Sequence, residues 1–154
     1  MSATLTLLHV IISLIGIVTG LIVIFGFLKP MQPGRMNFTF LLFTILTDIT
    51  GYIFFPFHGI TPAIKLGAIS LMVLIIAVLA LRKKRTITYI VAAIVAEFLN
   101  VFVLIVQSFL KIPALHNLAP KGNEPIVGII QLVVLVFFIV MAVLAIRKKA
   151  WRLA

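Results

Sequence analysis

The sequence predicts an all-α integral membrane protein: one transmembrane domain over residues 1–154, built as a bundle of about five helices. Composition is the first reason, because 64% of the 154 residues are hydrophobic and only 10% are charged. Soluble domains carry about 25% charged residues to face water. Lipid must therefore be the main solvent of this chain. Once the apolar runs are subtracted, only short loops remain, which leaves no room for a second domain.

The second reason is a series of apolar runs of membrane-spanning length, since about 20 mostly apolar residues cross a bilayer. These runs cover residues 5–28, 38–57, 62–81, 87–110 and 125–146. Pro62 and Pro125 suit the first turn of a helix, where a missing N–H costs nothing. The first run lacks the basic segment of a cleaved signal peptide and is predicted to be retained. The link before Pro62 is very short, so a re-entrant second helix and four spans remain an alternative.

Basic side chains gather at the ends of the apolar runs and predict the orientation. They form clusters at Lys29 and Arg35, at residues 82–85, and at residues 147–152. If the N-terminus lies outside and the C-terminus in the cytoplasm, ten of the thirteen Lys and Arg residues face the cytoplasm, as the positive-inside rule requires. This placement explains the net charge of +10 as a topology signal, and no nucleic-acid partner is expected.

Two acidic residues interrupt the apolar runs. Asp48 lies near the middle of the second run and Glu97 near the middle of the fourth, which places both about 15 Å from the cytoplasmic end at 1.5 Å per residue. Ionisable groups at this depth face the bundle interior and often mark function. Neighbouring carboxyls would share a proton or bind a cation. The alternative is two protonated, hydrogen-bonded links between helices, each contributing about 1 kcal/mol or less.

Other polar residues share helical faces with these acids. Thr44, Thr47 and Gly51 follow the spacing of Asp48, which puts them on one side of a helix. On the fourth and fifth runs the polar positions are Asn100, Gln107 and Gln131. Nearly all lie in the middle or the outer half of their runs. We therefore predict a pocket open to the outside, with its floor at Asp48 and Glu97 and with these amides as orienting groups. An inter-helix amide network is the alternative.

Small residues at four-residue spacing indicate close helix packing. Gly16 and Gly20 form one such pair, and Ala92 and Ala96 form another. The spacing alone does not distinguish packing inside the chain from dimerisation. The loop over residues 111–124 carries prolines and apolar residues, which indicate either an ordered cap or a plain surface loop.

Motifs for catalysis or for a bound cofactor are missing. Cysteine is absent, and no phosphate-binding loop, HExxH or GxSxG is present. The spacing of His9, His58 and His116 matches no standard zinc pattern. The sequence thus indicates no catalytic residue and no metal ligand, and it leaves any cofactor unknown.

Residues 100–115 (NVFVLIVQSFLKIPAL), followed by LAP at 118–120 and EP at 124–125, resemble a pattern in small multi-pass bacterial inner-membrane proteins of uncharacterised function. Residues 50–58 (TGYIFFPFH) resemble the same proteins, and the resemblance covers roughly residues 37–146. It implies the cytoplasmic membrane of a bacterium and a unit of four or five helices. It implies no activity.

The function that these patterns favour is binding or transport of a proton, a cation or a small polar ligand through the outward-open pocket. The alternative is a non-catalytic accessory or scaffold subunit of a membrane complex. An enzyme acting on a lipid or a quinone is less favoured, because no nucleophile and base stand together. The expected partners are the lipid bilayer and either further copies of the chain or a larger membrane complex.

Overall fold

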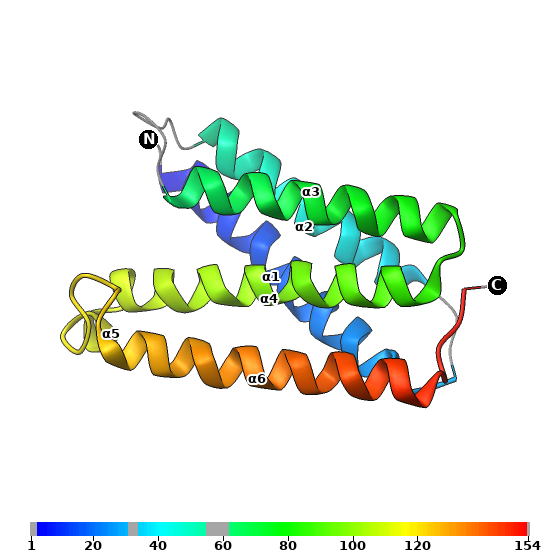
Figure 1. Cartoon of the computed structure of the whole chain (residues 1–154). Coiled ribbons are helices and arrows are strands. Elements are labelled where there is room, and N and C mark those ends of the chain that lie inside the picture. Colours follow the sequence, from blue (N-terminus) through cyan, green and yellow to red (C-terminus); the bar gives the residue numbers. More distant parts are fainter. Residues whose placement is uncertain (1–2, 31–33, 55–61, 154) are drawn as a thin grey trace.

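The computed structural model of the chain describes residues 3–30, 34–54 and 62–153. These residues form six helices and no strand (Figure 1). In chain order the helices are α1 (Ala3–Gly26), α2 (Arg35–Phe54), α3 (Pro62–Arg82), α4 (Thr86–Lys111), α5 (Pro113–His116) and α6 (Pro125–Lys148). Within the described ranges, the all-helical prediction is confirmed.

Five of these helices are long and apolar enough to cross a membrane, as expected for a multi-pass membrane protein. They are α1, α2, α3, α4 and α6, and they correspond to the predicted runs. Helix α1 begins and ends two residues earlier than predicted, and α2 begins three residues earlier, at Arg35. The predicted end of the second run at residue 57, the link that follows it and His58 lie outside the described residues.

Helix α4 is the centre of the bundle. It contacts α1, α3, α5 and α6, while α1 packs along α2 and α2 also contacts α3. In Figure 1, α3, α4 and α6 run alongside one another, and α1 and α2 cross behind them. Because α4 is central, each of its faces packs against a different neighbour. Its polar residues can therefore lie on one face and its apolar residues on another.

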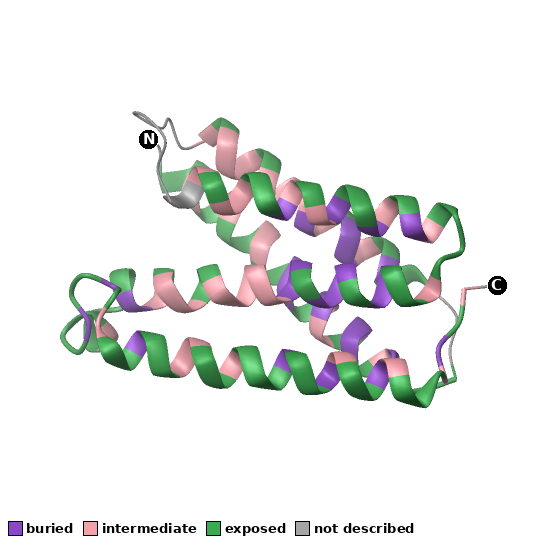
Figure 2. Ribbon diagram, in the orientation of Figure 1, coloured by how far each residue is buried: buried purple, intermediate pink, exposed green. Residues whose placement is uncertain are grey.

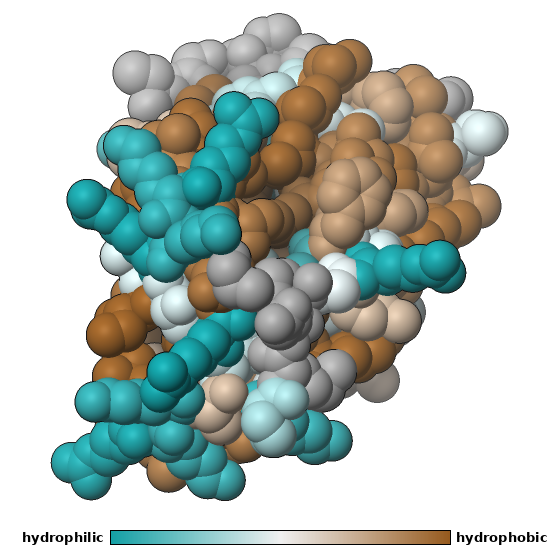
Figure 3. All heavy atoms as spheres, turned by 90° about the vertical axis from the view of Figure 1, so that its right-hand side faces the viewer, coloured by the Kyte–Doolittle hydropathy of each residue, from teal (hydrophilic) through white to brown (hydrophobic). Residues whose placement is uncertain are grey.

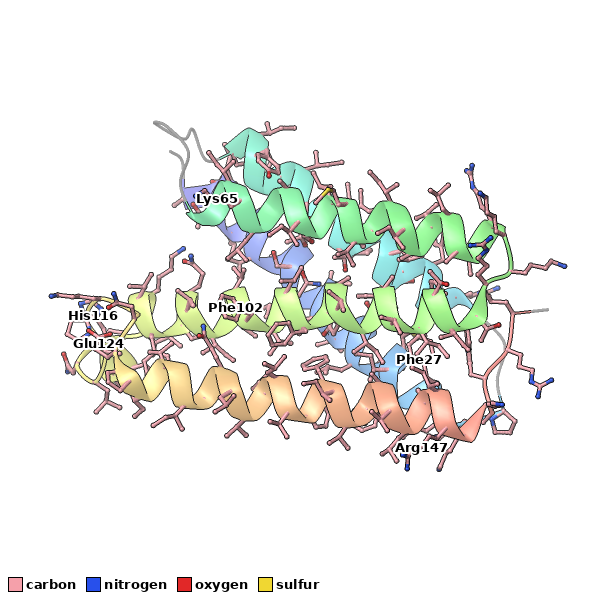
Figure 4. All side chains as sticks on the ribbon, in the orientation of Figure 1. Phe27, Lys65, Phe102, His116, Glu124 and Arg147 are labelled. Atoms are coloured by element: carbon pink, nitrogen blue, oxygen red, sulfur yellow. The ribbon has the colours of Figure 1, made fainter. Side chains whose placement is uncertain are left out.

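One end of the bundle carries most of the basic side chains, and we call it the basic end; the opposite end, which carries α5, is the α5 end. The basic end includes the residues from Arg82 to Arg85 and from Arg147 to Lys149. Figure 3 looks onto this end and shows groups of hydrophilic side chains beside hydrophobic surface. Figure 4 shows Arg147 and Phe27 here, with Lys65, His116 and Glu124 at the α5 end.

Two similar stretches end helices at the basic end. Residues 77–84 (AVLALRKK) end α3 and residues 142–149 (AVLAIRKK) end α6. In both, the final lysine adopts a left-handed conformation, with φ of 54° at Lys84 and 49° at Lys149. The N–H of Arg85 then donates to the carbonyl of Ala80 at 2.8 Å, a bond that satisfies an end carbonyl of the helix. A left-handed lysine thus follows both helices, two residues after the end of α3 and one residue after the end of α6.

Buried residues gather in the half of the bundle nearer the basic end (Figure 2). The larger buried cluster includes Phe40, Leu74, Ile90 and Phe138, and a smaller cluster near α5 contains Phe109, Ala119 and Val127. Large apolar side chains cover the outer surfaces of the long helices, as expected where helices face lipid rather than water.

The segment after α6 folds back over the basic end and packs its Trp151 ring against the rings of Tyr89 and Phe27. Trp151 is 2% exposed. Its ring stacks on Tyr89 with centroids 5.3 Å apart and meets Phe27 edge-on at 5.0 Å. The Tyr89 hydroxyl donates to Asn37 Oδ1 at 2.8 Å, so its polar end is satisfied. We call Phe27, Tyr89 and Trp151 the aromatic cap. It connects the end of α1 to the start of α4.

Candidate functional site: a cavity toward the α5 end

A cavity of about 680 Å³ lies between α1, α2, α3 and α4 in the half of the bundle nearer the α5 end. Apolar side chains such as Leu14, Leu66 and Val103 form much of its wall. Exposed residues also line it, so it opens to the surface. Its polar lining residues come from all four helices: His9, Ser13, Thr47, Asp48, Tyr52, Ser70, Asn100, Gln107, Ser108 and Lys111.

Asp48 is the acidic residue of the cavity wall, and it is half-buried. Its carboxyl lies beside the hydroxyl of Ser70 on α3. Asp48 Oδ2 and Ser70 Oγ are both buried and have no hydrogen-bond partner. The two side chains therefore lie close together without forming a regular hydrogen bond. Buried polar atoms are costly when left unpaired. A ligand that pairs with Asp48 Oδ2 would remove this cost.

Specific contacts hold the walls of the cavity together. His9 Nδ1 on α1 is 2.8 Å from Thr50 Oγ1 on α2, and the Tyr52 hydroxyl donates to the carbonyl of Ile64 on α3 at 2.8 Å. A Cβ on Gly67 would lie 2.8 Å from the Tyr52 hydroxyl oxygen, so a glycine is needed for α3 to approach this ring. These contacts fix α2 between its two neighbours.

Glu97 lies behind the cavity rather than in its wall. The side chain is 0% exposed, and it is absent from the cavity lining. Its Oε2 accepts a bond from Asn100 Nδ2 at 3.4 Å, and the same amide donates to Thr44 Oγ1 at 3.3 Å. Its Oε1 has no hydrogen-bond partner. Asn100 thus separates an enclosed carboxyl from the cavity that it lines.

The space for the Glu97 carboxyl is created by Gly20 on α1. A Cβ on Gly20 would lie 2.5 Å from Glu97 Cδ and 2.9 Å from Phe40 Cδ2, which is closer than real Cβ atoms approach. Gly16, one turn away, packs against α2, where a Cβ would be 3.4 Å from the Thr44 nitrogen. The glycine pair therefore packs against helices of the same chain.

The structure brings most of the predicted site residues together. Asp48, Asn100 and Gln107 line the cavity, and Glu97 lies next to it. Among the contacts of the described residues, none joins Asp48 directly to Glu97. Ala92 and Ala96 are buried in the larger cluster, at 5% and 0% exposure.

Gln131 does not reach the cavity, because α6 packs against a different face of α4. This second face carries Phe98, whose ring lies 5.8 Å from that of Phe138 on α6. Asn100 and Gln107 point away from it, into the cavity. Gln131 is half-buried on α6 and forms no part of the cavity lining.

Sequence reasoning missed Tyr52 and Gly67, although a signal for Tyr52 was present. Tyr52 follows Asp48 by four residues, so the two share a helical face. Gly67 gave no comparable signal, since its role depends on the neighbouring helix. Within residues 3–30, 34–54 and 62–153, no group of three or more potential metal ligands comes together.

The loop between α4 and α6 is built around Glu124. The backbone N–H groups of Lys121 and Asn123 donate to its two carboxylate oxygens at 2.8 and 3.1 Å. These bonds, that from Lys121 first, hold the pKa of Glu124 below its usual value. Ala119 is 0% exposed and packs with Phe109 and Val127. The loop is thus ordered over the α5 end.

The fold and the cavity define a class, a small multi-pass helical bundle with a cavity between four of its helices in the half nearer the α5 end. Comparisons with protein-family models, with curated proteins and with solved structures gave no match for the chain. The geometry of the cavity therefore carries the functional argument.

Proposed function

We propose that this protein binds a small hydrophobic cation in the cavity and that the Asp48 carboxylate is its anchor. The observation that carries the proposal is the unpaired Oδ2 of Asp48 in a cavity with largely apolar walls. Apolar walls favour the body of an organic ligand. Asp48 is the acidic residue of a lining that also contains Lys111 and His9, and its carboxylate favours a positive charge beside it. The volume of about 680 Å³ falls within the range of small-molecule sites.

We further propose that the ligand enters from outside the cell. This orientation rests on the basic end, because Lys and Arg favour the cytoplasmic side of a membrane. With the basic end in the cytoplasm, the cavity occupies the outer half of the bundle. The aromatic cap and the larger buried cluster then lie in the inner half. The resemblance noted above supports the cytoplasmic membrane of a bacterium as the location.

Binding of two ions of matched shape and opposite charge tests the proposal. Purified protein in lipid nanodiscs would be dialysed against tetraphenylphosphonium, a cation, and against tetraphenylborate, an anion of similar size. Because lipid itself absorbs the anion more strongly than the cation, uptake by protein-free nanodiscs is subtracted for each ion. We expect the protein to bind the cation more tightly. Asp48→Asn should weaken its binding about tenfold or more, the equivalent of about 1.4 kcal/mol.

Glu124→Gln is the matched control, because it removes an acidic side chain that lies outside the cavity. Its affinity for tetraphenylphosphonium should equal that of the wild type. Equal affinity for the two ions, or unchanged binding in Asp48→Asn, would refute the proposed function.

The alternative role as an accessory subunit would use small-residue faces to dock a partner. Gly16 and Gly20, the strongest such pair, already pack against α2 and α4 of the same chain. We therefore favour ligand binding.

A further inference from the structure

Glu97 is a second acidic site that the cation-binding proposal does not use. The chain contains only three acidic residues, Asp48, Glu97 and Glu124. Asp48 lines the cavity, and Glu124 is held by backbone donors in the loop at the α5 end. Glu97 alone is completely enclosed, at 0% exposure.

The surroundings of Glu97 provide no compensating charge. Helix α1 presents Gly20 to the carboxyl, and α2 presents Phe40 beside the same glycine. Its hydrogen-bond partner on α4, Asn100, is neutral. The titratable groups nearer the α5 end of these helices, His9, Asp48 and Lys111, line the cavity. Within the described residues, none of them forms a hydrogen bond or an ion pair with Glu97.

An isolated carboxylate inside a membrane protein is strongly disfavoured unless a proton or a cation neutralises it. The Glu97 carboxyl itself fills the space beside Gly20, so a metal ion has no room there. A proton needs none, and the unpaired Oε1 is available to carry it. Neutralisation by a proton is therefore the solution that fits this geometry.

Asn100 provides the connection to the outside. Its amide contacts the Glu97 carboxyl and the Thr44 hydroxyl, and its side chain lines the cavity. Water in the cavity would thus be one side chain away from the buried acid. Positive charge in the cavity would favour the ionised form of a nearby carboxyl, and binding at linked sites is reciprocal.

We propose that Glu97 is a proton-binding site, and that a cation bound in the cavity displaces this proton, which leaves Glu97 past the Asn100 side chain into the cavity. The second half of this statement rests on the proposed cation binding, and the first half does not. Proton binding at Glu97 and cation binding in the cavity then oppose each other, so one ion is exchanged for the other.

Dicyclohexylcarbodiimide tests the proton site, because this apolar reagent modifies protonated carboxyls. The carboxyl O–H adds across one C=N bond: oxygen bonds to the carbon and the proton moves to the nitrogen. The product rearranges to a stable N-acylurea without losing an atom. In an Asp48→Asn, Glu124→Gln background, Glu97 is the remaining acidic side chain. We expect one adduct per chain at neutral pH by intact mass, lost on further Glu97→Gln substitution.

Infrared spectroscopy of the same variants provides a measurement that does not depend on access of the reagent. A protonated carboxyl has its own C=O stretching band, and we expect such a band that disappears with Glu97→Gln. Gln keeps the shape of the side chain and an oxygen that accepts from Asn100, so this variant should fold. Absence of a Glu97-dependent band, together with absence of the adduct, would overturn the proton site.

The displacement is tested with Asp48 intact. Saturating tetraphenylphosphonium should reduce the Glu97 band and release protons in weakly buffered solution, whereas tetraphenylborate should change neither. Binding of tetraphenylphosphonium without loss of the band would overturn the linkage and leave cation binding intact. Failure of tetraphenylphosphonium to bind would refute cation binding and with it the linkage, while the adduct and the band still decide the proton site.

Discussion

Adding one methyl group at Gly20 should destabilise the bundle. In Gly20→Ala the new Cβ would lie 2.5 Å from Glu97 Cδ and 2.9 Å from Phe40 Cδ2. Either α1 moves away from α4 or the carboxyl leaves its space. Such overpacking costs about 1–3 kcal/mol, and replacing a helical glycine with alanine returns up to about 1 kcal/mol. We expect a net loss of about 1–2 kcal/mol in the free energy of unfolding.

Gly16→Ala is the matched control on the same helix. Its Cβ would be 3.4 Å from the Thr44 nitrogen and 3.5 Å from the Phe43 carbonyl carbon, which are tolerable contacts. We expect a change in stability of less than about 1 kcal/mol, because the gain in helix propensity offsets the tighter packing. Both variants would be compared with wild type by equilibrium unfolding in mixed micelles, followed by circular dichroism.

A double-mutant cycle identifies the clashing group. In a Glu97→Ala background the carboxyl is gone, so Gly20→Ala should cost at least about 1 kcal/mol less than in the wild type. Equal costs in the two backgrounds would refute the assignment of Gly20 as the space for Glu97. So would a Gly20→Ala variant as stable as Gly16→Ala.

Two further predictions concern the ends of the bundle. Trp151→Ala removes the ring that stacks on Tyr89 and meets Phe27 edge-on, and it should destabilise the protein by up to about 3–5 kcal/mol. Thermal unfolding measures this, and an unchanged midpoint would contradict the aromatic cap. The lowered pKa of Glu124 means that its carboxylate stabilises the loop above the ordinary value of 4.5 and that this contribution disappears as the pH falls through the folded value. Proteolysis of the loop should therefore increase in acid for wild type but show no such pH dependence in Glu124→Gln.

The positions of the helices could be predicted from the sequence because they depend on local properties. Runs of apolar residues, Pro62 and Pro125 at helix starts, and basic clusters at helix ends are each readable within a few turns of chain. The half of the bundle that holds the cavity was also predictable, because the polar residues are concentrated there. Asp48, Asn100 and Gln107 followed from their shared helical faces.

The contacts between helices could not be predicted in the same way. A helix that is hydrophobic on all sides gives no periodic signal of its orientation, so nothing assigned Gln131 to a face away from the cavity. The position of Glu97 behind Asn100 depends on Gly20 of another helix. The sequence near Trp151 resembles an ordinary basic tail, and its burial arises only when α1 and α4 meet.

The left-handed lysines at the ends of α3 and α6 have a consequence for how the chain tolerates change. Lys84 and Lys149 adopt a conformation that glycine accepts freely and that costs other residues about 1–2 kcal/mol. Glycine would make either turn easier but would remove a positive charge from the basic end of the bundle. Helix ends elsewhere are commonly completed by glycine. At both turns the chain thus combines a less favourable backbone conformation with a positive charge at the basic end.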